Sequence, residues 1–187
     1  MKNQPLKKEV NKKHRHNYGS GDCCCGQHSH NHNHNDDIFK RFENENISFL
    51  YPSNWQLEHT ALNGIDDSIQ LSNNSGSFWF LKKYPFGTNP EAIAREAVAA
   101  MEAEYKEIET EPFEKQAFGK IITGFDISFF YLDLVNSAKV LCFEDNGLVY
   151  AVFWQTGNQL LIRSDDSLPV EDVLEAITHS LFAGFAE

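Results

Sequence analysis

Apolar residues divide the chain into two parts. The first 37 positions hold few large apolar residues, among them Leu6, Val10 and Tyr18, whereas such residues recur steadily from there to the C-terminus. A segment so poor in apolar side chains cannot bury enough surface to offset its chain entropy. We therefore predict a disordered tail over residues 1–37 and a single folded domain over residues 38–187.

Short apolar runs predict strands in the first half of the domain. Residues 47–55 are typical of a strand that stops at Pro52, because proline cannot donate a hydrogen bond to a neighbouring strand. Two further strands are predicted over residues 69–71 and 77–84, on either side of the turn-forming residues 73–76.

A helix with clear boundary signals is predicted next. Asn89 is the expected N-cap and Pro90 takes the first helical position, while Pro112 lies beyond the expected end. On the outer side, Glu102 and Lys106 are spaced to pair across one turn. The apolar stripe comprises Ile93, Ala97, Met101, Tyr105 and Ile108.

The second half is predicted to be mostly strands joined by short turns. Asn146-Gly147 supplies the two positive-φ positions of a type I′ hairpin. Residues 148–154 are apolar at every position, which predicts a central strand covered on both faces. The predicted strands span residues 121–134, 138–144, 148–155 and 159–163.

A final helix is predicted after Ser167 and Pro169. Its apolar stripe comprises Val170, Val173, Leu174, Ile177 and Leu181. An antiparallel sheet flanked by helices accommodates all of these elements, so we predict an α+β fold.

The predicted opening strand resembles that of a known superfamily. Ile47-Ser48-Phe49-Leu50-Tyr51-Pro52, followed by Trp55, is similar to the start of the PsbP-like superfamily, which includes PsbP, the Ran-binding Mog protein and bacterial DcrB-type proteins. The later elements follow the same order, so the resemblance covers about residues 39–182. It implies an α/β/α sandwich and a binding or assembly role. It assigns no functional residue, because Tyr51, Pro52 and Trp55 look architectural, and the tail lies outside the family pattern.

Charge is divided unevenly between the two parts. Residues 1–37 carry six Lys and Arg against four Asp and Glu, whereas the rest of the chain carries ten against 23, a formal charge of −13. Such a body should repel nucleic acid and anionic membranes and should prefer a basic protein partner. An acidic surface that only maintains solubility is the alternative interpretation.

Two further patterns bear on location. No apolar stretch is long enough to span a membrane. The basic N-terminal segment lacks the apolar region of a signal peptide, so we expect a cytoplasmic protein whose thiols stay reduced.

Seven metal-ligating side chains lie within twelve residues of the tail. Thiolate and imidazole groups suit Zn²⁺, Cu(I) and Ni²⁺. The two-residue spacer between Cys25 and His28 lets the chain fold back on one ion, and alternate histidines project to one side of an extended segment. The predicted ligands are Cys23, Cys24, Cys25, His28, His30, His32 and His34, and His14 and His16 are available to join them.

The pattern does not decide which metal is bound. Adjacent cysteines fill a tetrahedral site poorly, so a closed structural zinc site is not predicted. A low-complexity tail without function, or an artificial His-Asn affinity segment, is the alternative interpretation. The three cysteines argue against an affinity tag.

The domain offers few candidates for catalysis. His59 and His179 are isolated in the sequence and Cys142 lies in an apolar run, so all three are predicted to be structural. No phosphate-binding loop, dinucleotide fingerprint, nucleophile elbow or His-Glu-x-x-His motif occurs. Three acidic pairs are predicted to occupy turns or a helix cap: Asp66-Asp67, Glu144-Asp145 and Asp165-Asp166. Two aromatic clusters, Phe78-Trp79-Phe80 and Phe129-Phe130-Tyr131, are predicted to belong to the sheet core, with a pocket as the alternative.

These patterns favour a non-catalytic binding or assembly protein whose domain docks a protein partner while its tail binds a transition metal. Two alternatives stay open. One is a pure protein-interaction domain with an incidental tail, and the other is a small-ligand-binding protein or hydrolase with an aromatic pocket. No cofactor is predicted within the domain.

Overall fold

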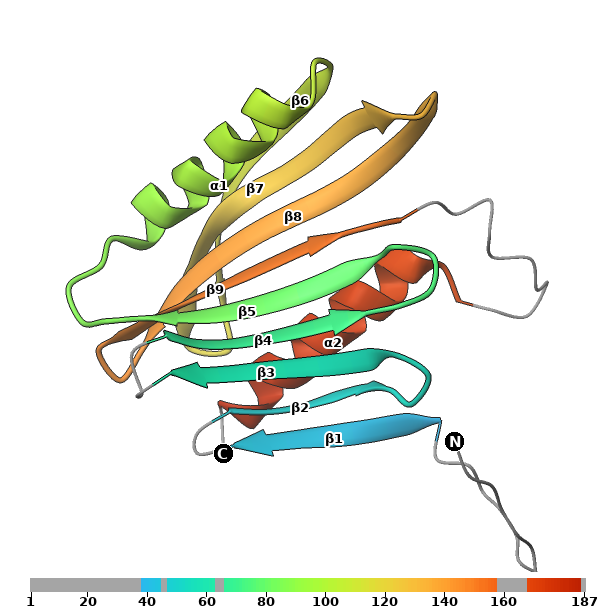
Figure 1. Ribbon diagram of the computed structural model, residues 1–187. Coiled ribbons are helices and arrows are strands. Elements are labelled where there is room, and N and C mark those ends of the chain that lie inside the picture. The colour runs from blue at the N-terminus through green and yellow to red at the C-terminus, as the bar shows by residue number, and fades with distance from the viewer. Residues whose placement is uncertain (1–37, 45–46, 63–65, 158–167, 186–187) are drawn as a thin grey trace, which may run out of the picture. The chain divides into compact units, whose positions relative to one another are not determined.

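An antiparallel sheet forms the middle layer of the structure, with one helix over each face (Figure 1). The computed structural model describes residues 38–44, 47–62, 66–157 and 168–185, all within one unit that spans residues 36–187. The metal ligands expected in the tail lie outside these described residues. So does the strand predicted over residues 159–163.

Within the described residues, nine strands and two helices follow one another along the chain. They are β1 (Phe39–Asn44), β2 (Ile47–Pro52), β3 (Gln56–Leu62), β4 (Asp66–Ser72), β5 (Phe78–Tyr84), α1 (Pro90–Glu104), β6 (Ile108–Ala117), β7 (Lys120–Tyr131), β8 (Leu134–Asp145), β9 (Leu148–Gln155) and α2 (Val170–Gly184). Seven of these strands form one sheet in the order β3-β4-β5-β9-β8-β7-β6, and β1 and β2 form a separate hairpin. No described helix is both long and apolar enough to cross a membrane.

The sheet has an apolar core on each side, because successive side chains of a strand point to opposite faces. On one face, α1 covers residues such as Val140, Cys142 and Ala151. On the other face, α2 and β2 cover Leu141, Val152 and their neighbours. The predicted α+β sandwich is therefore confirmed. Strand β9 lies at the centre of the sheet, as its unbroken apolar sequence predicted.

Close packing joins α2 to the β1–β2 hairpin. The backbone N–H of Leu50 donates a 2.9 Å hydrogen bond to the Ser180 hydroxyl. A side-chain carbon added to Gly184 would lie 2.3 Å from the carbonyl oxygen of Ser48, so only glycine permits this approach. Trp55 is buried beside this layer, as expected for an architectural residue.

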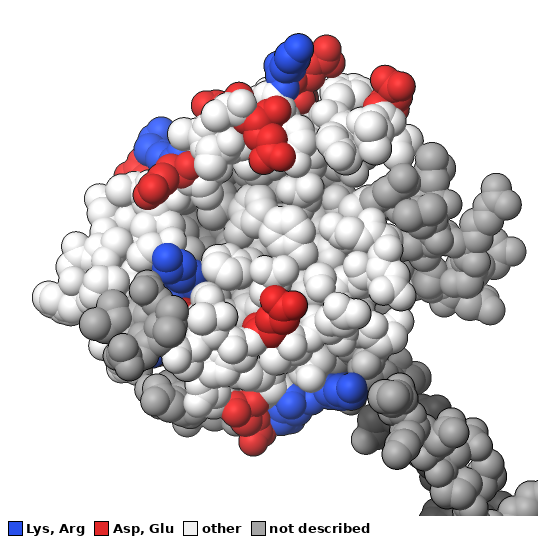
Figure 2. Space-filling view, in the orientation of Figure 1, with Lys and Arg blue, Asp and Glu red and all other residues white. Residues whose placement is uncertain are grey.

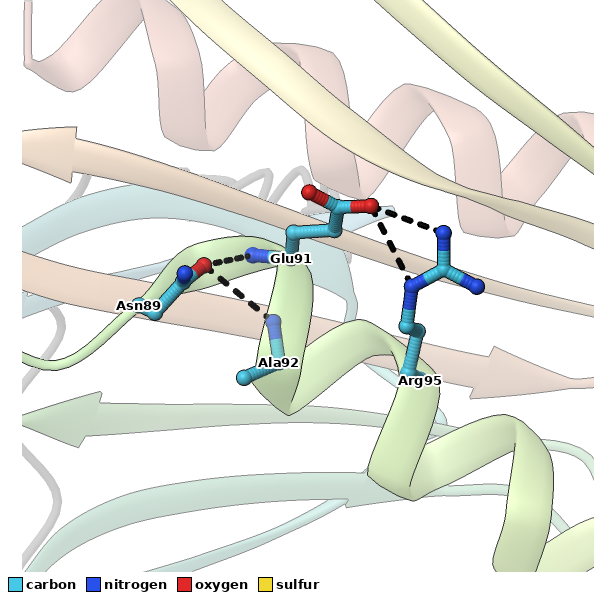
Figure 3. Close-up of polar contacts among 4 residues, drawn as sticks. All are labelled: Asn89, Glu91, Ala92 and Arg95. Atoms are coloured by element: carbon cyan, nitrogen blue, oxygen red, sulfur yellow. Dashed lines mark hydrogen bonds and ion pairs between the residues drawn. The ribbon is translucent and has the colours of Figure 1, made fainter.

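The start of α1 follows the predicted capping pattern (Figure 3). The side-chain oxygen of Asn89 accepts hydrogen bonds from the backbone N–H groups of Glu91, at 2.9 Å, and Ala92, at 3.2 Å. The carboxylate of Glu91 also pairs with Arg95 one turn later, at 2.8 Å. Both ends of this ion pair are exposed, so it adds little to stability.

The end of α1 differs from the prediction. The helix ends at Glu104, and Tyr105 is already extended, with its ring 4.3 Å from that of Phe129. Ile108 belongs to β6, where it pairs with Phe129, so its place in the helical stripe was wrong. Lys106 lies outside the helix and cannot pair with Glu102 across a helical turn.

The strand boundaries also differ in places. Pro112 lies inside β6, a strand at the edge of the sheet where a missing N–H is tolerated. The strand predicted over residues 121–134 is interrupted, because Leu132 and Asp133 form a turn between β7 and β8. Strands β1, β3 and β6 were not predicted.

Candidate functional site

Strand β5 separates its aromatic residues between the two faces of the sheet. Trp79 is fully buried on the α2 side, where its indole N–H donates a hydrogen bond to Thr178. Phe78 and Phe80 point to the opposite face and are only half-buried. The predicted core position was therefore right for Trp79 and wrong for its two neighbours.

The helix on that face lies to one side of β5. Helix α1 packs over β7, β8 and β9, and Figure 1 shows β3, β4 and β5 without a helix in front of them. A groove of about 630 Å³ remains between α1 and the exposed face of β5 and β9. Its sheet wall consists of Phe78, Phe80, Lys82, Tyr84, Val140, Ala151, Phe153 and Gln155, and its other wall of the α1 residues Ile93, Glu96, Ala97, Ala100, Met101 and Glu104 with Tyr105 just after the helix. We call this feature the aromatic groove.

Aromatic rings lie along the length of the aromatic groove. The rings of Phe78 and Phe153 are 5.6 Å apart on the sheet wall. Tyr105 closes one end from the helix side, and Tyr84 lies at the other end of β5 with the Lys82 ammonium 5.1 Å from its ring centre. Figure 2 shows this face as largely uncharged, hollowed below the acidic residues of α1.

Charged and polar groups line the edges of the aromatic groove. Glu96 and Glu104 lie on the helix side and Lys82 on the sheet side. Burial raises the pKa of the Tyr84 hydroxyl, and the nearby Cys142 and Glu96 raise it further. Burial also raises the pKa of Tyr105, against the opposing effect of a hydrogen bond to Gln155. Both hydroxyls are therefore protonated at neutral pH and can donate hydrogen bonds.

Cys142 lies in the core below the same face. It is fully buried, and burial raises the pKa of its thiol to about 12. A thiol with so high a pKa is a poor nucleophile at neutral pH. The expected structural role of Cys142 agrees with this environment.

A second polar cluster lies on the α2 face of the sheet. The His59 ring contacts a carboxylate oxygen of Asp67 at 2.7 Å, and the other carboxylate oxygen contacts Lys83 at 3.4 Å. Asp67 is buried within β4, so its predicted place in a turn was wrong. His59 is not isolated as the sequence suggested. Asp67 therefore links the His59 ring to the Lys83 ammonium across three neighbouring strands.

The sequence contained a signal for this cluster. Asn63-Gly64 is a strong hairpin dipeptide, and it lies between His59 and Asp67. A hairpin there brings the two residues onto neighbouring strands, and β3 and β4 do pair antiparallel, with Ala61 opposite Asp67.

Lys139 forms another polar link that sequence reasoning missed. Its ammonium contacts Asp126 at 3.0 Å and also pairs with Glu175 of α2. Burial lowers the pKa of Lys139, but its hydrogen bonds to Glu175 and Asp126 outweigh burial and the pKa is raised. Lys139 is therefore charged at neutral pH and connects β8 to α2.

The remaining candidates are placed apart from the aromatic groove. His179 is exposed on α2, 6.0 Å from the ring of Phe118. Asp145, at the end of β8, pairs with Lys120. Asp165 and Asp166 lie outside the described residues. Across the parts of the chain that are described, no three His, Cys, Asp or Glu side chains are grouped to hold a metal ion.

The arrangement of layers defines an α/β/α sandwich with a PsbP-like fold, in agreement with the resemblance noted in the sequence. The solution structure of cyanobacterial PsbP (CyanoP) from Synechocystis sp. matches with a TM-score of 0.55 at 11% identity, covering 84% of this chain and 96% of that one. A Pseudomonas aeruginosa protein of unknown function matches with a TM-score of only 0.35 at 11% identity, covering 64% and 83%. Neither a protein-family model nor a curated protein sequence matches this chain.

Proposed function

We propose that the protein is a non-catalytic binding protein that takes an apolar ligand into the aromatic groove. The observation that carries this proposal is the incompletely covered face of β5, where the partly buried Phe78 and Phe80 lie beside a helix that packs on other strands. Large apolar patches on protein surfaces commonly mark interaction sites. The groove volume of about 630 Å³ lies within the range of known ligand sites.

The titratable groups in and below the groove favour ligand binding over catalysis. The hydroxyls of Tyr84 and Tyr105 and the thiol of Cys142 all have a raised pKa and stay protonated at neutral pH. They are therefore neither bases nor activated nucleophiles. The two hydroxyls are suited to orient a ligand by donating hydrogen bonds.

Charge favours a ligand or partner that carries a basic group. Glu96 and Glu104 line the helix side of the groove against Lys82 on the other side. The chain outside the tail carries a formal charge of −13. Aromatic rings also attract cations over their faces, and complementary charge speeds association.

Binding of the neutral fluorophore Nile red tests this proposal. We expect saturable binding that weakens about tenfold in Ala100→Glu, because the new charge must lose water when the dye enters. Ala99→Glu is the matched control, since Ala99 is exposed on the same helix and does not line the groove. Equal affinity in both variants would exclude the groove as the binding site.

Metal binding by the tail is a second, independent proposal. Its support is the density of ligands, seven within the twelve residues from Cys23 to His34. These ligands suit Zn²⁺, Ni²⁺ or Cu(I). We include a cytoplasmic location in this proposal, because Cys23, Cys24 and Cys25 bind metal only while they are reduced.

A further inference from the structure

Three hairpins of the sheet use the same two-residue turn with very different residues. Both turn positions have positive φ, which glycine and asparagine tolerate best. The β8–β9 turn has Asn146 and Gly147, the preferred pair. The β6–β7 turn has Phe118 and Gly119, and the β7–β8 turn has Leu132 and Asp133.

The two apolar residues at these positions differ in their surroundings. Phe118, with φ of 54°, stacks on Phe182 of α2 with ring centres 5.2 Å apart. That stacking offsets the cost of the left-handed backbone. Leu132, with φ of 51°, leaves 70% of its surface exposed. A strained residue that gains so little packing from its own fold suggests a role outside it.

The surroundings of Leu132 are also apolar and exposed. Phe130, Tyr131 and Val135 leave more than half of their surfaces in contact with solvent. Tyr131 and Leu132 line one hollow on the α1 side of the sheet, whereas Phe130 and Val135 pair with each other and point to the opposite face. We call Tyr131 and Leu132 the hairpin tip, because these two lie next to the aromatic groove.

The hairpin tip continues the aromatic groove. The ring of Tyr131 is 6.1 Å from that of Tyr105, which lines the groove. Gln155 lines the groove and also a smaller hollow of about 150 Å³ shared with Tyr131 and Leu132. The two apolar surfaces therefore meet at the Phe78 end of β5.

The combined surface has the length of an extended peptide. Strand β5 contributes seven residues, and β8 runs four residues past its last pairing with β9, from Leu134 to Ser137. At about 3.3 Å for each residue, these eleven residues extend over roughly 35 Å. A small molecule that fits the groove does not reach the tip, whereas about ten residues of extended chain reach both.

The acidic residues around the hairpin tip and the groove favour a basic polypeptide over a membrane or a second copy of this chain. Asp133 lies at the apex of the hairpin tip, and Glu104 lies beside Tyr105. A carboxylate at the apex opposes insertion into a bilayer. The acidic body disfavours a second copy of this chain, whereas it attracts a basic polypeptide.

We propose that the aromatic groove and the hairpin tip together bind one extended, apolar and basic polypeptide segment of about ten residues. This inference rests on the proposed function and names its ligand class. Alternate apolar side chains of the segment lie against Phe78, Phe80 and Tyr131, and its basic side chains face Glu96, Glu104 and Asp133.

Fluorescence anisotropy with a labelled decapeptide of alternating Leu and Lys tests this inference. We expect Leu132→Asn to weaken peptide binding about tenfold. The same change should raise the thermal midpoint, because asparagine tolerates the left-handed backbone better than leucine. Ile121→Asn is the matched control, since Ile121 is nearly as exposed as Leu132, at 65% against 70%, but lies at the other end of β7. We expect this control to bind the peptide like the wild type.

The outcomes separate this inference from the proposed function. Unchanged Nile red binding in Leu132→Asn, together with weaker peptide binding, supports both. If Leu132→Asn binds the peptide as tightly as the wild type, the hairpin tip has no role in binding. That result would leave the proposed function standing, provided that Ala100→Glu still weakens Nile red binding. Equal binding of an alternating Leu-Glu peptide overturns the basic ligand class. If the wild type binds vesicles of neutral phosphatidylcholine and Leu132→Asn does not, the polypeptide proposal is overturned and the hairpin tip binds a membrane.

Discussion

The indole N–H of Trp79 donates a 3.0 Å hydrogen bond to the hydroxyl of Thr178, which links the sheet to α2 inside the core. Both residues are buried, and the Thr178 hydroxyl in turn donates to the carbonyl of Leu174. We expect Thr178→Val to lower the free energy of unfolding by about 1–3 kcal/mol, because it leaves the indole N–H without its partner. Urea denaturation measures this loss.

A double-mutant cycle isolates the bond itself. Combining Trp79→Phe with Thr178→Val should cost less than the sum of the two single changes, because the second change removes nothing further from the pair. Strictly additive losses would show that the bond contributes nothing beyond packing.

The cluster of Asp67, His59 and Lys83 supports a second prediction. Asp67→Ala should destabilise the protein by about 2–3 kcal/mol, because it leaves the Lys83 ammonium without a carboxylate in a largely buried position. Adding Lys83→Met should recover part of the loss, since the isolated charge is then removed. A double variant no more stable than Asp67→Ala alone would contradict this account. Guanidinium denaturation of the three proteins provides the comparison.

Elements that are determined by neighbouring residues were predicted correctly from the sequence, and those that depend on a distant strand were not. The start of α1 needed only Asn89 and Pro90, and the β8–β9 turn needed only Asn146 and Gly147, so both were predicted correctly. Ile108 continued the helical spacing of α1, but its pairing with Phe129 on a distant strand decided its structure. Local spacing carries no information about such a partner.

The site was harder to predict than the fold. Alternation along β5 indicates that Phe78 and Phe80 share a face opposite to Trp79, but it does not say which face stays uncovered. That depends on where α1 lies across the sheet, which is a property of the whole fold. The edge strand β6 was missed because its side chains are mostly exposed and polar, so it lacks an apolar alternation.

Alkaline pH provides a third prediction. The pKa of Cys142 is about 12 in the folded protein against 9.0 for an ordinary thiol. The protonated thiol is favoured by folding, so this contribution is complete below pH 9 and is lost as the pH rises towards 12. The free energy of unfolding should fall by at most about 1.4 kcal/mol for each pH unit from this group.

Cys142→Ala serves as the comparison for the pH experiment. Over pH 9 to 10 its stability should fall less steeply than that of the wild type, because the variant has no thiol to ionise at this position. Above pH 10 both proteins should lose stability, since Tyr84 and Tyr105 also have a raised pKa. Parallel curves for the two proteins between pH 9 and 10 would refute the role of Cys142. Urea titrations at successive pH values give these curves.

The proposed metal site gives a fourth prediction. Protons compete with metal for imidazole and thiolate, which titrate near ~6.5 and ~8.5. Affinity should therefore fall as the pH is lowered from about 7.5 to 5.5. Changing Cys23, Cys24 and Cys25 to Ser should weaken Zn²⁺ and Cu(I) more than Ni²⁺, which histidines can hold alone.

Competitive titration tests the metal prediction with three proteins. They are the wild type, the triple Cys→Ser form, and a form in which His28, His30, His32 and His34 are changed to Ala. Equal uptake of metal by all three would remove the tail as the binding element.

The central place of β9 has a consequence for synthesis of the chain. Among the described strands of the large sheet, every neighbouring pair is consecutive in sequence except β5 and β9. Strand β5 therefore emerges from the ribosome with one open edge, and β6, β7 and β8 must follow before its partner is made. Strand edges that are apolar and unpaired are prone to aggregate until their partner strand is made. A nascent chain that stalls before Leu148 has two partial sheets, linked only through α1, and lacks the strand that pairs with both.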